Sequence, residues 1–253
     1  NQNYYFFNKK SSIPVVFIHG VGLDHQMWDK QIDYFSEFSI LTYDLLGHGK
    51  TPFNKEKLNL KDFSNQLLEL LDHLKIETIN LVGFSLGSLI ALDFSSRFQN
   101  KVEKLILIGT TYKRSDQERS LVLDRYNQAK LNKPISRQAL KRWFSDKYLK
   151  QNPKTYDFFI KILNKMPDDH KNFLKAYELF ANHYDDLEAI KKIDRKTLVM
   201  TGSEDVGSTP AMSKELVKDL VNSTYIEIKN GKHLCSIECE DDVNMNIKKF
   251  INN

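Results

Sequence analysis

Apolar residues along the chain follow two patterns, short runs rich in β-branched residues and longer stretches with helical spacing. Short apolar runs bounded by turn residues indicate buried strands, whereas apolar residues every three or four positions indicate amphipathic helices. The strand-like runs are Val15–Ile18, Ile40–Tyr43, Ile79–Val82, Leu105–Ile108, Thr197–Met200 and Tyr225–Ile228. Strands that alternate with helices predict βαβ units, and therefore an α/β fold with a mostly parallel central sheet and helices on both faces.

The amphipathic stretches between the first four runs are long enough to cross from one strand to the next. They lie at residues 25–37, 60–75 and 86–98. After the fifth and sixth runs, further helices are expected at residues 211–221 and 241–251. Tyr4–Phe7 is expected to add an antiparallel strand at the edge of the sheet.

The strand pattern stops after Gly109 for some eighty residues, and only helical patterns follow until the fifth run. The predicted helices cover residues 115–130, 136–150, 153–166 and 168–182. Ser115 with Glu118 resembles a capping box, Ser136 can cap, and Pro153 suits a first helical turn. The sequence therefore predicts a core domain made of residues 1–111 and 191–253, with residues 112–190 inserted as a helical cap.

Composition fits a folded domain, because 41% of the 253 residues are apolar and 28% are charged. No apolar run approaches the roughly 18 residues of a membrane-spanning helix, and the first ten residues lack the order of a secretory signal. We therefore expect a cytoplasmic protein without membrane partners. The two cysteines, Cys235 and Cys239, are too few for a disulfide framework or a zinc site, so we expect a structural role and no metal.

Charge is distributed unevenly, although the whole chain carries only +4. Residues 112–192 contain 18 Lys and Arg against 11 Asp and Glu, whereas the rest of the chain is slightly acidic. A basic cap is typical either of a solvated surface or of an enzyme that attracts anionic substrates. Candidate cap residues for such a role are Lys113, Arg114 and Arg142, the last beside Trp143.

The segment Gly83-Phe84-Ser85-Leu86-Gly87 follows a strand-like run and opens an amphipathic one. This strand, turn and helix with the pattern Gly-x-Ser-x-Gly is typical of a nucleophile elbow. The turn holds the serine in a strained conformation with its Oγ exposed, and the glycines allow backbone and helix to approach closely. Ser85 is therefore predicted to be a catalytic nucleophile.

A serine nucleophile needs a base and a carboxylate that orients the base. His233 follows the last strand-like run, and Asp205 lies in the loop after the preceding one, with Glu204 as the rival acid. The chain order Ser, Asp, His is that of α/β-hydrolases. Among the other histidines, His19, His25 and His48 could line a pocket, whereas His73, His170 and His183 lie in helical patterns. Asp24 and Asp44 are interpreted as a cap and a turn residue.

Attack on a carbonyl also needs donors for the oxyanion. In this kind of fold, they are the backbone N–H after the nucleophile and one from an early loop. Leu86 is the first, and Val21 in His19-Gly20-Val21-Gly22 is our choice for the second.

Five motifs together resemble the α/β-hydrolase superfamily over essentially the whole chain. They are His19-Gly20-x-Gly22, Tyr43-Asp44-x-x-Gly47-His48-Gly49, Gly83-x-Ser85-x-Gly87, Gly202-x-x-Asp205 and Gly231-x-His233. Within the superfamily, the segments Met27-Trp28-Asp29, Leu71-Asp72-His73-Leu74 and Gly207-Ser208-Thr209-Pro210 are similar to the branch of 3-oxoadipate enol-lactonases and small carboxylesterases. The resemblance implies hydrolysis without metal or cofactor under a helical cap, and Ser85 counts against the branches with an aspartate nucleophile.

The sequence thus predicts a serine hydrolase that cleaves a small carboxylic ester or lactone through an acyl-enzyme. Two alternatives stay open: hydrolysis of an acyl ester or thioester on a carrier protein, as in pimeloyl-carrier methyl ester esterases, and a ligand receptor that retains the triad but hardly turns over. A small molecule is the expected partner, with no nucleic acid, and the protein is expected to be a monomer or homodimer. His19, His25, Arg114, Arg142 and Trp143 are the candidate substrate-binding residues.

Overall fold

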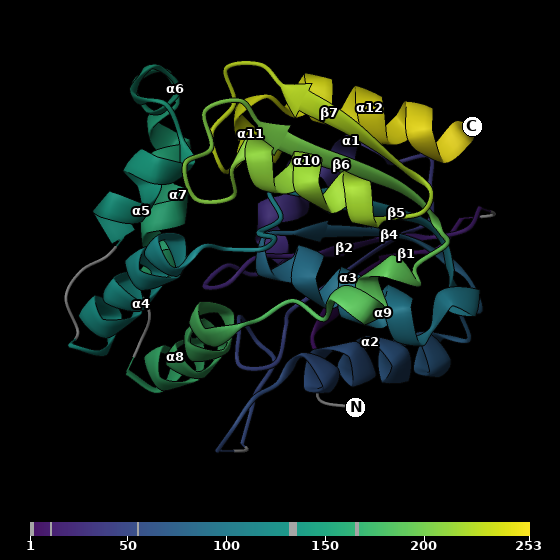
Figure 1. Cartoon of the computed structure of the whole chain (residues 1–253), viewed down its shortest axis with the longest axis horizontal. Helices are drawn as coiled ribbons and strands as arrows, with labels where there is room; N and C mark the ends of the chain where they lie inside the picture. Colours follow the sequence, from purple (N-terminus) through teal and green to yellow (C-terminus); the bar gives the residue numbers. More distant parts are fainter. Residues whose placement is uncertain (1–2, 11, 55, 132–135, 165–166) are drawn as a thin grey trace.

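A seven-stranded sheet runs through the molecule in this computed structural model, which describes residues 3–10, 12–54, 56–131, 136–164 and 167–253 (Figure 1). The strands are β1 (Tyr5–Asn8), β2 (Val15–Ile18), β3 (Ile40–Tyr43), β4 (Ile79–Phe84), β5 (Val102–Ile108), β6 (Lys196–Gly202) and β7 (Ser223–Ile228). Their order is β1-β3-β2-β4-β5-β6-β7, with only β1 antiparallel to its neighbour. The predicted α/β class, parallel sheet and edge strand are confirmed.

Helices cover both faces of the sheet, as the continuous apolar runs of its central strands require, since every residue of β2 and β4 is buried. One face packs against α2 (Leu60–Leu74), α3 (Leu86–Arg97), α9 (Leu187–Lys191) and α10 (Pro210–Asp219). The other packs against η1 (His25–Trp28), α1 (Asp29–Tyr34), α11 (Cys235–Glu238) and α12 (Glu240–Asn252). A short turn, η2 (Gln99–Lys101), precedes β5. The hydrophobic core therefore forms two clusters, one on each side of the sheet.

The inserted segment forms a layer of helices beyond the carboxyl ends of the strands (Figure 1). The helices are α4 (Asp116–Lys130), α5 (Ser136–Trp143), α6 (Asp146–Gln151), α7 (Pro153–Leu163) and α8 (Pro167–Asn182). The predicted capping box of Ser115 and Glu118 and the first-turn position of Pro153 are confirmed. The side chain of Ser136, also predicted to cap, lies outside the described residues.

The single helix expected over residues 136–150 is wrong, because α5 ends at Trp143 and α6 begins at Asp146. The turn between them is held from both sides. Ser145 caps α6 by accepting a hydrogen bond from Tyr148 N, and its own N–H donates to Glu238 Oε1 at 3.0 Å. Helical spacing alone did not show this break, because the carboxylate that stabilises the turn comes from α11.

The cap consists of two halves that pack into different clusters. Val122 and Tyr126 of α4 and Phe173 of α8 belong to the same cluster as α2, α3 and α10. Leu140 of α5 and Phe159 of α7 belong to the cluster on the opposite face of the sheet. We call α4 with α8 the first cap half, and α5, α6 and α7 the second cap half. Each half has its own hydrophobic support.

Within the described part of the chain, no helix combines the length and the apolar character that crossing a membrane requires.

Cys235 is buried in the core, as expected, with an exposed fraction of 0%. Burial raises the pKa of its thiol, so the sulfur stays protonated and unreactive. Its side chain packs close to Gly231, where an added Cβ would lie 2.9 Å from Cys235 Cβ.

Cys235→Ala is therefore expected to lower the free energy of unfolding by about 1 kcal/mol, since it leaves only a small cavity, and to change kcat little. Urea unfolding and kcat of the purified variant measure the two effects. A loss of kcat as large as that of His233→Ala in folded protein would contradict this structural role.

Candidate active site

Ser85 occupies the sharp turn between β4 and α3, with φ 53° and ψ −115°. A residue other than glycine seldom adopts this conformation, which concentrates at functional sites. The flanking glycines are required by close packing. A Cβ on Gly83 would lie 2.4 Å from the Gly87 carbonyl oxygen, and one on Gly87 would lie 2.3 Å from the Ile18 carbonyl oxygen. The tight contact of α3 with β4 and β2 thus forces Ser85 to the top of the turn.

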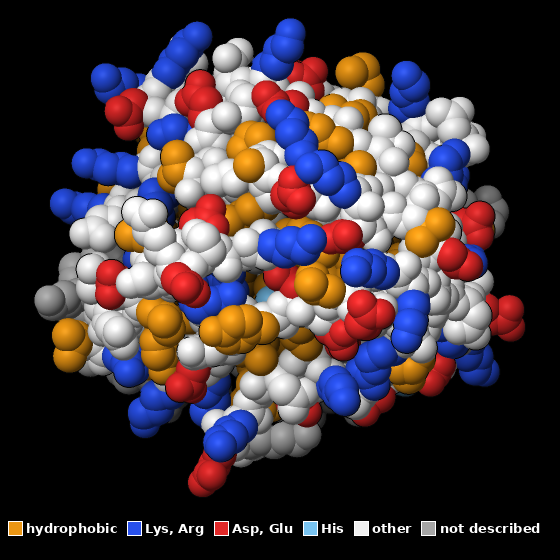
Figure 2. Space-filling view, in the orientation of Figure 1, with side chains coloured by type: hydrophobic (Ala, Val, Ile, Leu, Met, Phe, Trp, Pro, Cys, Tyr) orange, Lys and Arg blue, Asp and Glu red, His pale blue; other side chains and the backbone are white. Residues whose placement is uncertain are grey.

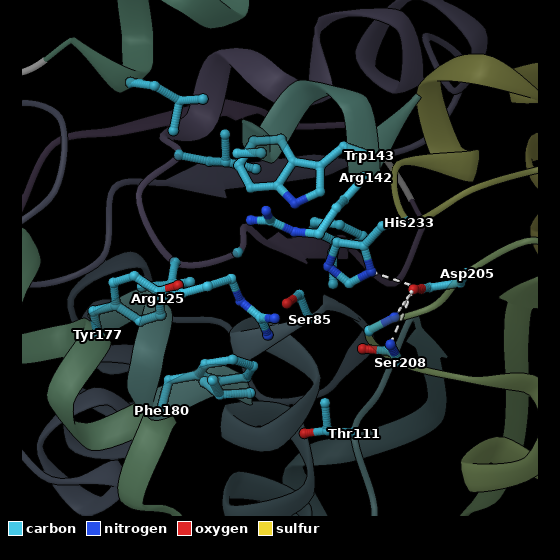
Figure 3. Close-up of a pocket in the computed structure, with 18 of the residues that line it drawn as sticks. Ser85, Thr111, Arg125, Arg142, Trp143, Tyr177, Phe180, Asp205, Ser208 and His233 are labelled. Carbon is cyan, nitrogen blue, oxygen red and sulfur yellow. Dashed lines mark hydrogen bonds and ion pairs between the residues drawn. The ribbon is translucent and has the colours of Figure 1, made fainter. Parts of the chain in front are cut away.

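His233 and Asp205 form a hydrogen-bonded pair at the ends of β7 and β6. His233 Nδ1 lies 2.7 Å from Asp205 Oδ2, and the Asp205 side chain is buried. The other carboxylate oxygen, Oδ1, accepts hydrogen bonds from Gly207 N at 2.8 Å and Ser208 N at 2.9 Å (Figure 3). A carboxylate held in this way fixes the imidazole with the proton on Nδ1, which leaves Nε2 free to accept a proton.

The three residues of the predicted triad line one pocket under the cap. Glu204, the rival acid, is exposed, whereas the carboxylate that contacts His233 belongs to Asp205. Figure 3 shows Ser85 beside the His233 ring. The Ser85 hydroxyl forms no hydrogen bond to another described residue, an arrangement that often tightens only when substrate binds. Figure 2 shows a hollow on this face with a histidine visible in it.

Gly20 and Val21, the predicted oxyanion loop, also line the pocket. His19 lies behind this loop and is fully buried. Its Nε2 accepts a hydrogen bond from Leu45 N at 3.0 Å, so its Nδ1 carries the proton and donates to the Gly20 carbonyl at 2.8 Å. Leu86 is the first residue of α3, where a backbone N–H has no acceptor within the helix. His19 was expected to line the pocket, but it instead holds the oxyanion loop from behind.

Two arginines and an indole bring polar groups into a largely apolar pocket. Arg142 and Trp143, two of the candidate substrate-binding residues, line the pocket from the end of α5, and Arg125 lines it from α4. Burial lowers the pKa of Arg142 below its usual value, and the charge of Arg125 lowers it further. We did not anticipate Arg125. Its position three residues after buried Val122, on the same face of α4, is the signal that could have identified it.

Two further candidates lie outside the pocket lining and have other partners. Arg114 is buried, and its Nη2 donates to the carbonyls of Phe180 at 2.7 Å and His183 at 3.2 Å at the end of α8. Its guanidinium therefore joins the start of the inserted segment to the end of α8 and does not line the pocket. Lys113, the third basic candidate, pairs with Asp219 at 2.6 Å.

His25 pairs with Asp44, with Nδ1 2.7 Å from Oδ1. Asp24, His25 and Asp44 are the one group among the described residues whose ligand atoms lie close enough to hold a metal ion. Asp44 Oδ1 also accepts from His25 N, and Oδ2 accepts from Lys50 N. Asp24 caps η1 through Gln26 N. These bonds support the interpretation of the two aspartates as turn and cap residues.

The second cap half is fastened to the loop that carries His233. Leu234 N donates to the Trp143 carbonyl at 3.0 Å. Glu238 connects the same two segments, because Oε1 accepts from Ser145 N at 3.0 Å and Oε2 accepts from Lys232 N at 3.3 Å. The end of α5, with Arg142 and Trp143, is therefore positioned by the same hydrogen bonds as the His233 loop.

Fold and site together define a class of hydrolase. A model of the alpha/beta hydrolase fold family matches residues 13–238, and the chain belongs to this family. The resemblance seen in the motifs is thereby confirmed.

The relatives include named enzymes at modest identity. (E)-2-((N-methylformamido)methylene)succinate hydrolase of Acinetobacter baylyi is 26% identical over 99% of this chain and 95% of its own length. 3-Oxoadipate enol-lactonase 2 of the same organism is 24% identical over 93% of this chain and 87% of its length. The enol-lactonase structure from Burkholderia xenovorans LB400 superimposes with a TM-score of 0.91 at 23% identity, covering 99% of this chain and 96% of the other, which shows the shared fold.

Proposed function

We propose that this protein is a serine hydrolase that cleaves a small carboxylic ester or lactone through an acyl-enzyme. The observation that carries the proposal is the common pocket of the strained Ser85 elbow and the His233–Asp205 pair. A serine nucleophile needs a base and a carboxylate that orients this base, and the pocket brings together one candidate for each role.

In the proposed reaction, Ser85 Oγ attacks the carbonyl carbon while His233 Nε2 takes the hydroxyl proton. Asp205 stabilises the imidazolium that forms, and the N–H groups of Val21 and Leu86 bind the oxyanion. The tetrahedral intermediate then expels the alkoxide, which receives the proton from His233. Water, deprotonated by His233, attacks the acyl-enzyme, and Ser85 leaves with its proton restored. In a lactone the leaving hydroxyl remains attached to the acyl group.

Two observations support a small substrate. The pocket walls are largely apolar, with side chains from both cap halves such as Phe173 and Leu163 closing over Ser85. Two relatives that cover nearly the whole chain are named for hydrolysis of a substituted succinate and of an enol-lactone. An enclosed, mostly apolar pocket with a few polar groups is typical of small-molecule sites.

The test is hydrolysis of a panel of aryl acetates, aryl butyrates, five- and six-membered lactones and carrier-bound acyl esters, combined with labelling by an aryl phosphonate. We expect turnover of free esters or lactones and a phosphonyl adduct on the peptide that contains Ser85. Folded protein that neither hydrolyses the panel nor forms the adduct would refute the proposal and favour a receptor. Turnover of the carrier-bound esters alone would favour the carrier-dependent alternative.

A further inference from the structure

Arg125 and Arg142 face the same space without a protein anion between them. Figure 3 shows the two side chains reaching into the pocket from opposite sides, toward Ser85. No carboxylate among the described residues forms an ion pair with either guanidinium, and neither donates a hydrogen bond to another described residue. Arg97 and Arg195 pair with Asp93 and Asp194.

Like charges that meet in a half-buried pocket destabilise the protein, because burial removes the water that screens them. Burial is the main reason that the pKa of Arg142 is lowered, and the charge of Arg125 is the second, so this repulsion contributes to the shift. Planar guanidinium groups bind carboxylates with several hydrogen bonds in fixed geometry. An anion between the two groups would remove the repulsion and supply the missing acceptors.

The two arginines also come from different halves of the cap. Arg125 lies on α4, which packs with α8 in the first cap half. Arg142 lies at the end of α5, in the second cap half, which is fastened to the His233 loop by Leu234 N and Glu238. An anion that touches both guanidiniums would therefore connect two separately supported parts of the cap directly over Ser85.

We propose that a carboxylate of the substrate binds between Arg125 and Arg142 and joins the two cap halves over Ser85. The inference rests on the proposed function in that the anion is part of the ester or lactone that Ser85 attacks. The substrate class is then an ester or lactone that carries a free carboxylate, held at one end by the two guanidiniums and presenting its acyl carbon to Ser85 at the other. If the free carboxylate lies on the acyl part or on a lactone, hydrolysis releases an acid with at least two carboxylates. If it lies on the alcohol part of an ester, each of the two products carries a carboxylate.

Binding can be tested without catalysis, with glutarate as the probe. The chain has two tryptophans, and Trp28 is 0% exposed whereas Trp143 lines the pocket, so acrylamide quenching reports mainly on Trp143. We expect glutarate to protect Trp143 saturably at constant ionic strength. Arg125→Gln and Arg142→Gln should each weaken glutarate binding at least about tenfold, because each removes charged hydrogen bonds. Arg137→Gln, on the exposed side of α5, is the matched control and should bind glutarate as the wild type does.

Kinetics tests whether one carboxylate bridges both arginines. The measured quantity is the ratio of kcat/KM for monophenyl glutarate to that for phenyl valerate, which lacks the carboxylate. We expect each single variant to lower this ratio at least about tenfold, and the double variant to lose less than the product of the two single losses. Arg137→Gln should leave the ratio unchanged.

Two results would overturn the inference. The first is that glutarate does not protect Trp143 in the wild type, or protects it equally in Arg125→Gln and Arg137→Gln. The second is that the loss in the kcat/KM ratio of the double variant equals the product of the two single losses, which would indicate two independent sites. Failure of the proposed function is distinguishable from both. Ser85→Ala protein should still bind glutarate if the inference holds, whereas hydrolysis of phenyl acetate by the wild type tests Ser85 whether or not the arginines bind anions.

Discussion

Ser85→Ala is expected to lower kcat for any hydrolysed ester by about 10⁴-fold or more while the protein stays folded. The substitution removes the attacking oxygen and leaves the other parts of the site in place, so only the weak catalysis by the oxyanion donors remains. Stability should change little, because the hydroxyl forms no hydrogen bond to another described residue and the backbone N–H still donates to the Ile108 carbonyl. Steady-state kinetics and thermal unfolding of the pure variant measure both effects.

Ser96→Ala is a suitable control for this experiment. Ser96 lies near the end of α3, the helix that begins just after Ser85, and its hydroxyl donates to the Asp93 carbonyl away from the pocket. The control should retain wild-type kcat. Turnover by Ser85→Ala close to that of the control would show that Ser85 is not the nucleophile.

Asp205→Asn is expected to lower kcat by up to about 10⁴-fold through the tautomer of His233. The orientation of the new amide follows from the structure. Gly207 N and Ser208 N both donate to Oδ1, so the amide oxygen should stay at that position and the NH₂ group should face His233. An NH₂ donor requires that Nδ1 of His233 be unprotonated, which places the ring proton on Nε2. A protonated Nε2 can no longer accept the proton of Ser85.

The neighbouring carboxylate provides the matched control, because Glu204 is exposed and has no bond to His233. Glu204→Gln removes the same charge one residue away and should change kcat less than about twofold. The prediction fails if Asp205→Asn behaves like Glu204→Gln in folded protein. NMR of the His233 ring nitrogens would show the expected change of tautomer directly.

Short-range requirements explain why the sequence predicted the sheet and which residues of the candidate site would lie together at its edge. A buried parallel strand needs a continuous apolar run, and an elbow needs small residues at two fixed offsets from its serine. In Val15–Ile18 and Gly83 to Gly87, neighbouring residues in the sequence are therefore enough to predict the local structure. The same holds for Asp205 and His233, since each lies just after a strand. Parallel strands bring their carboxyl ends to one edge of the sheet, which is where these loops meet.

Neighbouring residues in the sequence did not determine which basic side chains of the cap face the pocket. Arg114 and Arg125 are both basic positions beside or within one helical segment, and helical spacing does not say which of them faces the pocket. Packing of α4 against α8 turns Arg125 toward Ser85, while the free carbonyls at the end of α8 bind Arg114. His25, another candidate substrate-binding residue, pairs with Asp44 and does not line the pocket.

The sequence by itself determined the fold class, the elbow and the positions of the predicted base and acid, because their physical causes act within a few residues. Only the tertiary structure decided the break after Trp143, the division of the cap into two halves and the meeting of Arg125 with Arg142. Each of these depends on contacts between segments far apart in the chain, such as Ser145 with Glu238. The sequence does not specify such contacts until packing has brought the segments together.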